Sequence, residues 1–416
     1  MEVIIAGGGI AGLACALSLH AAGVRAKVFE SAPRIDALGL GIHLQPNAIR
    51  ELTELGLGDA LAANAVAIEE LAFYSRHGQR IWSEPRGIAA GYRWPQYAIN
   101  RGTLQAILHD AVRARLGAQN VFTGHVLSGF QQDAHGVVAH FTDRVSGAPL
   151  AAARGDVLIG ADGIHSAVRR HYYPKQTLQF GGQLMWRSAI EWTPFLGGKT
   201  MIIAGHRNQK IVAYPMLQRP DGSVVLNWIA EQGASDAPPR EEWNRKVDKA
   251  LFAHAFKDWN FDWLDIPATI AKATDVFEFP KVDRDPIPRW SFDRVSLIGD
   301  AAHPMHPVGS QAGSQAIVDA RVIAYHLATC PLDPVQALRR YEAERLPVMR
   351  EVALTNRTLG PELVMEIVEE RAPAGFKHIH DVLSPEELQQ RADDFKRLAG
   401  FSVEQLNNRP SYGVRA

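Results

Sequence analysis

The chain has 416 residues, which is enough for two or three domains with buried cores. Its 44 basic and 45 acidic residues nearly cancel, so no net charge would attract nucleic acid or an anionic membrane. The two cysteines, Cys15 and Cys330, are too few for a disulfide framework or a metal cluster. Neither a secretory leader nor an apolar run near the roughly 18 residues of a membrane span is found. These properties indicate a globular cytoplasmic protein without metal, nucleic-acid or membrane partners.

Residues 1–30 have the pattern that begins a dinucleotide-binding site. A short apolar strand, residues 3–6, leads into GGGIAG at residues 7–12, which fits GxGxxG. In this motif the first glycine permits a tight turn, the second lets the backbone approach a pyrophosphate, and the third lets the helix pack on the strand. A second strand ends at Glu30, 18 residues after Gly12, where a carboxylate is placed to accept hydrogen bonds from a ribose.

The following segments alternate between loops, strands and helices. A loop over residues 31–45 contains His43, which is either a solvent-facing histidine or a functional one, and a helix begins at Pro46. Residues 71–82 predict a hairpin, an antiparallel piece within a parallel pattern. A strand from residue 96 runs into a helix over 103–116, with Arg101 at the junction as a surface charge or an anion contact.

Two strands joined by a hairpin are expected over residues 121–141, and a short buried strand over 156–160. Asp162 follows the buried strand, and a helix is expected at 165–170. A carboxylate at such a turn either caps the helix or contacts a ligand, and the sequence leaves both roles open.

Residues 183–229 contain four strand-like runs separated by turn signals, which predict a second, antiparallel sheet. Their large side chains, which either wall an aromatic pocket or form plain core, are Trp186, Tyr214, Met216 and Trp228. Arg187 is either the cation that binds an anionic substrate or an exposed surface arginine. For residues 233–263 we expect helix and loops.

A second glycine-and-acid turn is expected within residues 295–320. A buried strand ends at Gly299-Asp300, a proline-pinned loop follows, and a helix then begins among small residues. Free N–H groups at that helix start suit an anion or the edge of an electron-rich ring. From Pro331 onward, amphipathic helices broken at Pro361 and Pro373 indicate scaffold or an interface.

Three of these stretches together resemble the single-component FAD-dependent aromatic hydroxylases of the para-hydroxybenzoate hydroxylase type. They are GGGIAG with Glu30, GADGIHSAVR and LIGDAAHPMHPVG. Finer patterns, among them LGLGIHLQPNA, IWSEPRGIAAG, QYAINRGTLQ and MWRSAIEW, are similar to phenazine hydroxylases within this family. The resemblance implies an α/β fold with a Rossmann-like FAD-binding domain of the glutathione-reductase type, an inserted, mostly antiparallel β-sheet substrate domain and C-terminal helices. It places the FAD domain at 1–180 and 281–330, with a hairpin insertion at about 68–100, the substrate domain at 181–280 and the helical segment at 331–416.

The implied activity is hydroxylation of an electron-rich aromatic or heteroaromatic ring, with FAD as cofactor, NADH or NADPH as co-substrate, and O2. Oxygen would be delivered from a flavin C4a-hydroperoxide to a phenol or to a phenazine, pyridine or quinoline acid. The implied cofactor-binding residues are Gly7, Gly9, Ala11, Gly12, Glu30, Arg101, Val126, Asp162, Asp300, Pro307, Gly309 and Gly313. His43 or His306 would help to deprotonate the substrate, and its contacts would be Arg187, Tyr214 and Trp228. A monomer or homodimer is expected.

One stretch departs from the family pattern. Where the family usually has GGQGA after the proline, this chain has Gly309-Ser310-Gln311-Ala312-Gly313. An alanine in place of glycine is costly only where the backbone needs a positive φ or a close approach to the flavin. Two other functions remain open at this stage: a flavin oxidase or reductase without oxygen transfer, and a dinucleotide-sensing binding protein without turnover.

Overall fold

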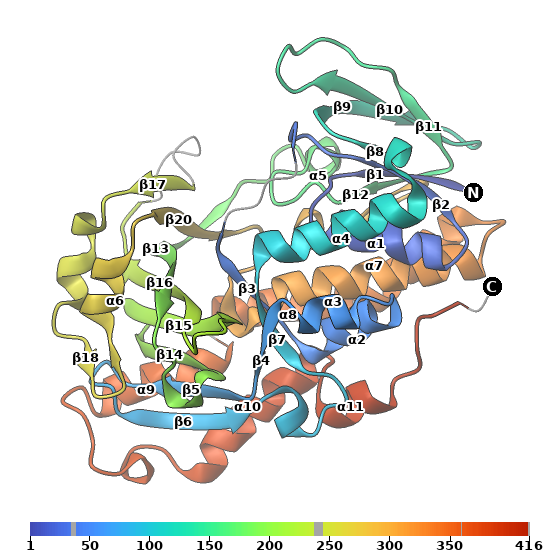
Figure 1. The fold of residues 1–416 in the computed structure, drawn as a ribbon. Helices are drawn as coiled ribbons and strands as arrows, with labels where there is room; N and C mark the ends of the chain where they lie inside the picture. Colours follow the sequence, from blue (N-terminus) through green and yellow to red (C-terminus); the bar gives the residue numbers. More distant parts are fainter. Residues whose placement is uncertain (35–38, 237–243, 359, 415–416) are drawn as a thin grey trace.

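The computed structural model describes residues 1–34, 39–236, 244–358 and 360–414. Its first sheet has six strands (Figure 1). In order across the sheet they are β21 (Ser291–Phe292), β22 (Val295–Leu297), β12 (Val157–Gly160), β1 (Glu2–Ala6), β2 (Arg25–Phe29) and β8 (Val121–Phe122). All neighbours are parallel except β21 and β22, which are antiparallel. Because parallel strands end at the same edge, the turns after β1, β12 and β22 lie together.

Helices surround this sheet. They are α1 (Ile10–Ala21), α2 (Pro46–Glu54), α3 (Gly58–Ala62), α4 (Arg101–Leu116), α5 (Ala167–Tyr172), α7 (Ala312–Thr329) and α8 (Pro334–Arg357). Of these, α2 packs on α7 and α3 packs on α2 and α4, so both lie outside the helices nearest the sheet. Helix α1 packs against both α4 and α7, and its apolar residues are buried nearly all round. A helix that is apolar all round belongs in a core, and this position fixes the glycine turn that precedes α1.

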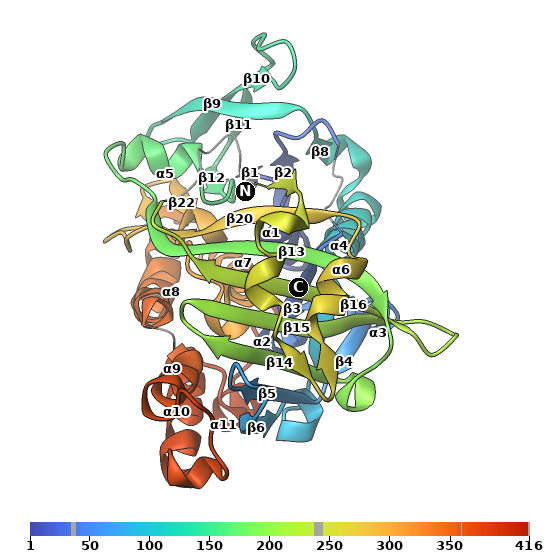
Figure 2. The same ribbon diagram turned by 90° about the vertical axis from the view of Figure 1, so that its left-hand side faces the viewer.

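The second large sheet has eight strands and contains the four runs predicted from residues 183–229. In order across the sheet they are β17 (Arg245–Val247), β20 (Val276–Asp283), β13 (Gln179–Trp192), β16 (Val224–Gly233), β15 (Gln209–Gln218), β14 (Thr200–His206), β5 (Glu70–Tyr74) and β6 (Arg80–Pro85). Strands β5 and β6 form the predicted hairpin, and β5 pairs in parallel with β14. The hairpin therefore extends this second sheet, as Figure 2 shows.

Smaller elements complete the fold. Antiparallel sheets are formed by β9 (His125–Gln132), β10 (Val137–Asp143) and β11 (Ala153–Gly155), by β3 (Gly41–Leu44), β7 (Gln96–Asn100) and β4 (Ala65–Ile68), and by β18 (Asn260–Phe261) and β19 (Leu264–Asp265). The remaining helices are α6 (Ile266–Lys272), α9 (Leu363–Arg371), α10 (Pro385–Leu398) and α11 (Val403–Asn408), and a 3₁₀ turn covers Gly360–Glu362. The C-terminal helices were predicted, and they lie along the second sheet near β5 and β6 (Figures 1 and 2).

Side-chain capping explains why two helices begin at residues other than those predicted. Helix α4 begins at Arg101 because Oδ1 of Asn100 accepts from the N–H groups of Gly102 and Thr103. Helix α5 begins at Ala167 because the hydroxyl of Ser166 accepts from the third N–H of the helix.

Two expectations about loops and helices are wrong. Part of the loop expected over 31–45 forms strand β3, although residues 35–38 lie outside the described residues. The segment 233–263 forms no α-helix where it is described; it has the end of β16, β17, 3₁₀ turns and β18, and residues 237–243 are not described. Its buried Phe252, Phe256 and Trp259 pack under the second sheet, and this packing outweighs helix propensity.

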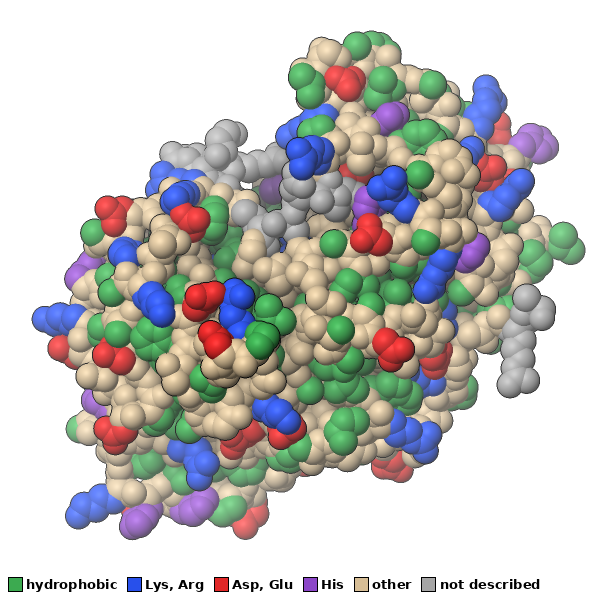
Figure 3. Space-filling view, viewed as in Figure 1, with side chains coloured by type: hydrophobic (Ala, Val, Ile, Leu, Met, Phe, Trp, Pro, Cys, Tyr) green, Lys and Arg blue, Asp and Glu red, His purple; other side chains and the backbone are tan. Residues whose placement is uncertain are grey.

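Acidic and basic side chains are interspersed over the face drawn in Figure 3, in keeping with a formal net charge of -1. No helix within the described part of the chain is both long enough and apolar enough to cross a membrane.

Candidate active site

The glycine turn after β1 forms a cradle for phosphate groups. A Cβ on Gly12 would lie 1.9 Å from the carbonyl oxygen of Gly7, so the packing of α1 on the turn requires glycine there. A Cβ on Gly9, in contrast, would meet nothing within 4 Å. No side chain caps the start of α1, so its first N–H groups, including that of Ala11, face this open space. This arrangement fits a bound pyrophosphate.

Glu30 closes the outer side of the cradle. Its Oε2 accepts a hydrogen bond of 2.6 Å from the N–H of Gly8, and its Oε1 accepts one of 2.7 Å from Ala32. The backbone oxygen of Glu30 accepts from His125, so the neighbouring Val126, which is half-buried, lies at the same edge. Glu30 and Val126, the residues predicted to contact the ribose and the adenine, are thus close together.

The Gly299-Asp300 turn lies beside the start of α1. A Cβ on Gly299 would approach Ala11 and Ala316 to 3.1 Å, so three small residues bring this turn, α1 and α7 together. Asp300 and Arg101 are both exposed, and each sits at the end of a strand where a ligand can reach it. A carboxylate and a guanidinium at these turns have the chemistry to bind the hydroxyls and phosphates of a dinucleotide.

Asp162 caps a helix. Its Oδ2 accepts from Ala167 at 2.7 Å and from Val168 at 3.4 Å, which supports the capping interpretation. Its Oδ1 is buried and has no hydrogen-bond partner among the described residues, and burial raises the pKa of this carboxyl above its usual value. The structure thus shows the capping role, and a ligand contact of Asp162 stays a prediction.

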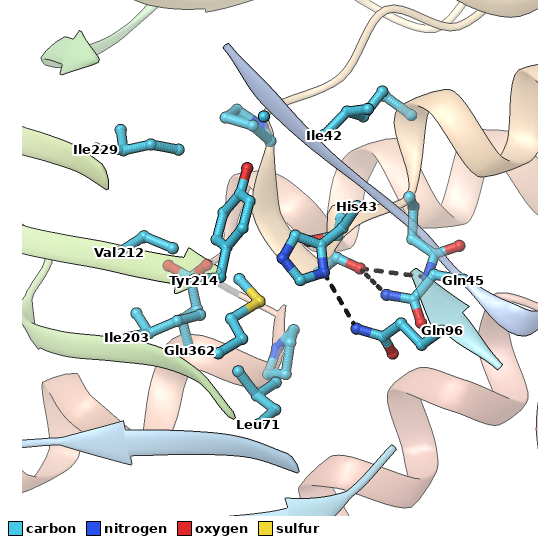
Figure 4. Close-up of a pocket in the computed structure, with 18 of the residues that line it drawn as sticks. Ile42, His43, Gln45, Leu71, Gln96, Ile203, Val212, Tyr214, Ile229 and Glu362 are labelled. Carbon is cyan, nitrogen blue, oxygen red and sulfur yellow. Dashed lines mark hydrogen bonds between the residues drawn. The ribbon is translucent and has the colours of Figure 1, made fainter. Parts of the chain in front are cut away.

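A cavity of about 260 Å³ lies between β3 and the second sheet (Figure 4). Its apolar walls include Leu71, Phe73, Ile203, Val212, Ile229 and Phe395. The loop from Pro307 to Gly313 forms its edge toward the dinucleotide cradle, and Arg101 lines the same edge. Apolar walls with a few polar groups are typical of a site for a flat organic ligand.

The 307–313 loop shows how the sequence departure is accommodated. Gly309 has a φ of +66°, and Ser310 keeps a φ of +53° although it is not glycine. Ala312 begins α7 without a positive φ, so the alanine costs nothing in backbone conformation. Gly313 packs against Ile42, which a Cβ would approach to 2.8 Å. The loop therefore accommodates Ala312 without backbone strain, and the strain falls on Ser310.

Arg187 and Tyr214 lie next to each other in the cavity wall. The Nη2 of Arg187 donates to the carbonyl oxygen of Gly41 at 2.8 Å, whereas its Nε is buried and has no partner in the described structure. Burial lowers the pKa of Arg187 from its usual value, and burial raises the pKa of Tyr214 to about 12. The pair therefore offers a cation and a neutral phenol to a ligand.

His43 is buried in this wall and does not face solvent. Its ring meets Tyr214 edge-on with centroids 4.1 Å apart, and Nδ1 lies 3.3 Å from Nε2 of Gln96 (Figure 4). Burial, with a smaller effect of Arg86, lowers the pKa of His43 to about 3. The imidazole is neutral near pH 7, and its Nε2 has no partner within the described residues.

The structure does not bring His306 or Trp228 to the cavity. His306 is buried 3.7 Å from Asp283, and burial lowers its pKa to about 4. Trp228 is in the core on the opposite face of β16, near Phe252, whereas Ile229 faces the cavity. Successive side chains of a strand point to opposite faces of the sheet, and the sequence did not reveal which of the two sets faces the cavity.

Several charged side chains of the cavity were missed in the sequence. They are Glu84, Arg86, Lys210, Glu231, Glu362 and Lys396. A signal existed for two of them, because Lys210 and Glu231 interrupt otherwise apolar strands. Glu362 and Lys396 come from the C-terminal segment, which the sequence indicated only as scaffold or interface.

A glycine-lined dinucleotide cradle that opens onto an apolar cavity defines the chain as a flavoprotein that acts on a flat organic molecule. The chain belongs to the FAD binding domain family, which matches residues 1–355. It is 42% identical over 363 residues to the phenazine 1,6-dicarboxylic acid hydroxylase PhzS of Lysobacter antibioticus, covering 86% of this chain and 89% of that protein. It is 32% identical to the 3-amino-4-hydroxybenzoate 2-monooxygenase PtmB3 of Streptomyces platensis, over 98% of both chains.

Solved structures share the fold. The HpxO protein of Klebsiella pneumoniae with FAD and uric acid has a TM-score of 0.72 and 23% identity, over 98% of this chain and 95% of that one. The CtdE protein with FAD and a substrate has a TM-score of 0.75 and 21% identity, over 96% and 98%. The predicted fold class and cofactor are confirmed. The protein is an FAD-dependent aromatic monooxygenase that uses NAD(P)H and O2.

Proposed function

We propose that this enzyme hydroxylates a planar, electron-rich heteroaromatic acid of the phenazine type. The observation that carries the proposal is Arg187, a largely buried cation in the wall of an apolar cavity, with a donor that lacks a partner among the described residues. An unpaired buried cation is costly, and a carboxylate on the substrate would compensate it. The 42% identity to a protein named as a phenazine dicarboxylic acid hydroxylase supports this ring class over a smaller phenol.

In this proposal FAD lies along the three strand ends. Its phosphates would meet the N–H groups around Gly9 and the Arg101 guanidinium, and its adenosine would meet Glu30 and Val126. The residues that would contact the rest of the cofactor are Gly7, Ala11, Gly12, Asp162, Asp300, Pro307, Gly309 and Gly313. Once reduced by NAD(P)H and supplied with O2, the flavin provides an electrophilic oxygen.

The protein's own residues place the substrate. Arg187 would hold a carboxylate by charge-assisted hydrogen bonds, which fixes the orientation of the ring. Tyr214 and the apolar walls would enclose the ring and exclude water from the reacting edge. His43, which is neutral, would accept a hydrogen bond from a ring hydroxyl at Nε2 and so orient it. Neither His306 nor Trp228 keeps a role at the substrate.

Product analysis tests this proposal. The purified enzyme is incubated with NAD(P)H, labelled dioxygen and matched pairs of acids and uncharged analogues on phenazine, quinoline, pyridine and phenol rings. One labelled oxygen atom should appear in a phenazine acid, and Arg187→Ala should raise KM far more for the acid than for its uncharged analogue. Oxidation of NAD(P)H without label in any product would favour an oxidase or reductase. An equal loss on acid and analogue would show that Arg187 is structural.

We also propose the division into an FAD domain at 1–180 and 281–330, a substrate domain at 181–280 and a helical segment at 331–416. A cytoplasmic location and a monomeric or homodimeric state belong to the same proposal. The order of strands in the second sheet supports one adjustment, because the hairpin at 68–100 contributes β5 and β6 to the substrate sheet. Limited proteolysis of the purified protein tests the domain boundaries, light scattering tests the oligomeric state, and cell fractionation tests the location.

A further inference from the structure

The charged side chains around the cavity do not balance one another. Five cationic side chains and three carboxylates line it. Lys210 lies 3.1 Å from Glu231 and 2.6 Å from Glu362, and Lys281 lies 3.5 Å from Glu231, so this buried group of four is neutral as a whole. Arg101 is at the dinucleotide edge, where FAD phosphates would compensate it. Two positive charges remain, at Arg187 and beside Glu84.

Glu84 is shared between two cations. Its Oε1 pairs with Arg86, and its Oε2 lies 2.5 Å from Nζ of Lys396. Arg86 and Glu84 are 6% and 4% exposed and the Lys396 side chain is 16% exposed, so this group of three carries a formal charge of +1 with little contact with bulk water. The Nε of Arg86 is buried with no partner in the described part of the chain. A buried net charge with an unsatisfied donor is costly unless a ligand compensates it.

The two uncompensated cations are neighbours of two aromatic rings that contact each other. Tyr214 packs edge-on against His43 (Figure 4). Arg187 lies beside Tyr214, and Arg86 is close enough to act on the charge of His43. His43 and Tyr214 both line the cavity, as do Arg86 and Arg187. A flat ring that packs on Tyr214 therefore lies in a cavity lined by both cations.

We propose that Arg86, with Glu84 and Lys396, forms a second anion subsite, so that the preferred substrate carries two acidic groups, one held by Arg187 and the other by Arg86. This deepens the proposed function and rests on it for the position of the first acid. Lys396 belongs to α10, beyond residue 355 where the family match ends. One cation of this subsite thus comes from outside the matched region, whereas Arg86 and Glu84 lie within it.

Binding to the oxidised holoenzyme tests the proposal without turnover, through the change in flavin absorbance on titration. The probes are phenazine-1,6-dicarboxylate against phenazine-1-carboxylate, and naphthalene-1,5-dicarboxylate against 1-naphthoate. Wild type should bind each diacid at least about tenfold more tightly than its monoacid, as expected for one added charge-assisted hydrogen bond. Arg86→Met should abolish that preference while changing monoacid affinity by less than about twofold, whereas Arg187→Met should weaken diacid and monoacid alike.

Glu84→Gln distinguishes a role of this group in binding the second acid from a purely structural role. It raises the formal charge of the group from +1 to +2, so the preference for diacids should increase, whereas damage to the fold would weaken both acids. If either buried variant fails to retain FAD, Lys396→Gln, at a side chain with 16% exposure, should lower the preference. Equal affinity of wild type for diacid and monoacid, or an equal loss of both in Arg86→Met, would overturn the subsite. A diacid preference on naphthalene without hydroxylation of any phenazine would refute the proposed ring class and leave the subsite intact.

Discussion

Nε2 of His303 lies 2.5 Å from Oδ2 of Asp319, and both side chains are buried beneath the Gly299-Asp300 turn. The same carboxylate accepts the N–H of Gly299 at 3.0 Å and the Nε of Arg345 at 2.8 Å. Burial alone would raise the pKa of Asp319, but His303 and Arg345 outweigh it and lower the pKa to about 2. One buried carboxylate thus fixes the turn that presents Asp300.

Because the folded pKa of Asp319 is lowered, its stabilising effect is present above the unfolded pKa and is lost as the pH falls from about 4 toward 2. The effect amounts to about 2 kcal/mol. Urea unfolding of wild type and Asp319→Asn should show a stability difference at pH 6 that shrinks by about that amount at pH 2. A difference that does not change with pH would mean that the carboxylate is not held in its charged form.

The fold holds Asp319 in its charged form, whereas it holds His43 in its neutral form. Its folded pKa of about 3 lies below the unfolded value, so stability falls as the pH drops below about 6.5, where only the unfolded chain takes up the proton. Relative to His43→Gln, wild type should lose about 2 kcal/mol between pH 7.5 and pH 5. The pH profile of kcat/KM between pH 5 and 8 should have the same shape in both proteins. A limb that disappears in the variant would show that His43 does gain a proton there.

Ser310→Gly should stabilise the protein, because glycine adopts the φ of +53° at this position without the cost borne by a side chain. We expect a gain of about 0.5–1 kcal/mol in the free energy of unfolding, with FAD retained. Ala312→Gly is the matched control: it restores the other family glycine, but at a helix start without a positive φ, and should be neutral or destabilising. Equal effects of the two changes would contradict the strain assigned to Ser310.

Glu30→Ala should weaken FAD binding by about 1.5–3 kcal/mol, because it removes a charged acceptor for the ribose and the bond that holds Gly8. Fluorescence of released FAD at equilibrium measures this. Glu2→Ala is the control, since Glu2 pairs with Lys27 at the start of β1, at the opposite end of the strand from the glycine turn. Unchanged FAD affinity in Glu30→Ala would show that the ribose binds elsewhere.

The parts of the fold that the sequence predicted are those with local signals. Strand β1, its glycine turn and α1 follow one another within 21 residues, and the four central strands of the second sheet each have their own apolar run and turn. Pairing between distant segments has no such signal. The β5–β6 hairpin was predicted, but its place beside β14 depends on packing with residues more than a hundred positions away.

The residues of the site also divide into those with local sequence signals and those that meet only through long-range packing. The dinucleotide residues lie in contiguous motifs, whereas Glu84 and Lys396 are 312 positions apart and meet only in the folded chain. His43 and Trp228 show a second limit. The sequence did not predict that β3 packs under Tyr214 and buries His43, nor which of Trp228 and Ile229 faces inward, because both depend on which face of a strand the neighbouring layer covers.

Glu362 and Lys396 line the cavity but lie beyond residue 355, so part of the cavity wall comes from outside the region that the family model matches. The first 355 residues hold all the residues proposed for FAD, together with Arg86, Arg187 and Tyr214 of the cavity. The C-terminal segment reaches the cavity through few side chains, among them Phe395, and holds none of the residues assigned to FAD. Exchange of residues 356–416 between relatives would therefore replace Glu362, Phe395 and Lys396 of the cavity wall in one recombination event and leave the residues proposed for FAD unchanged.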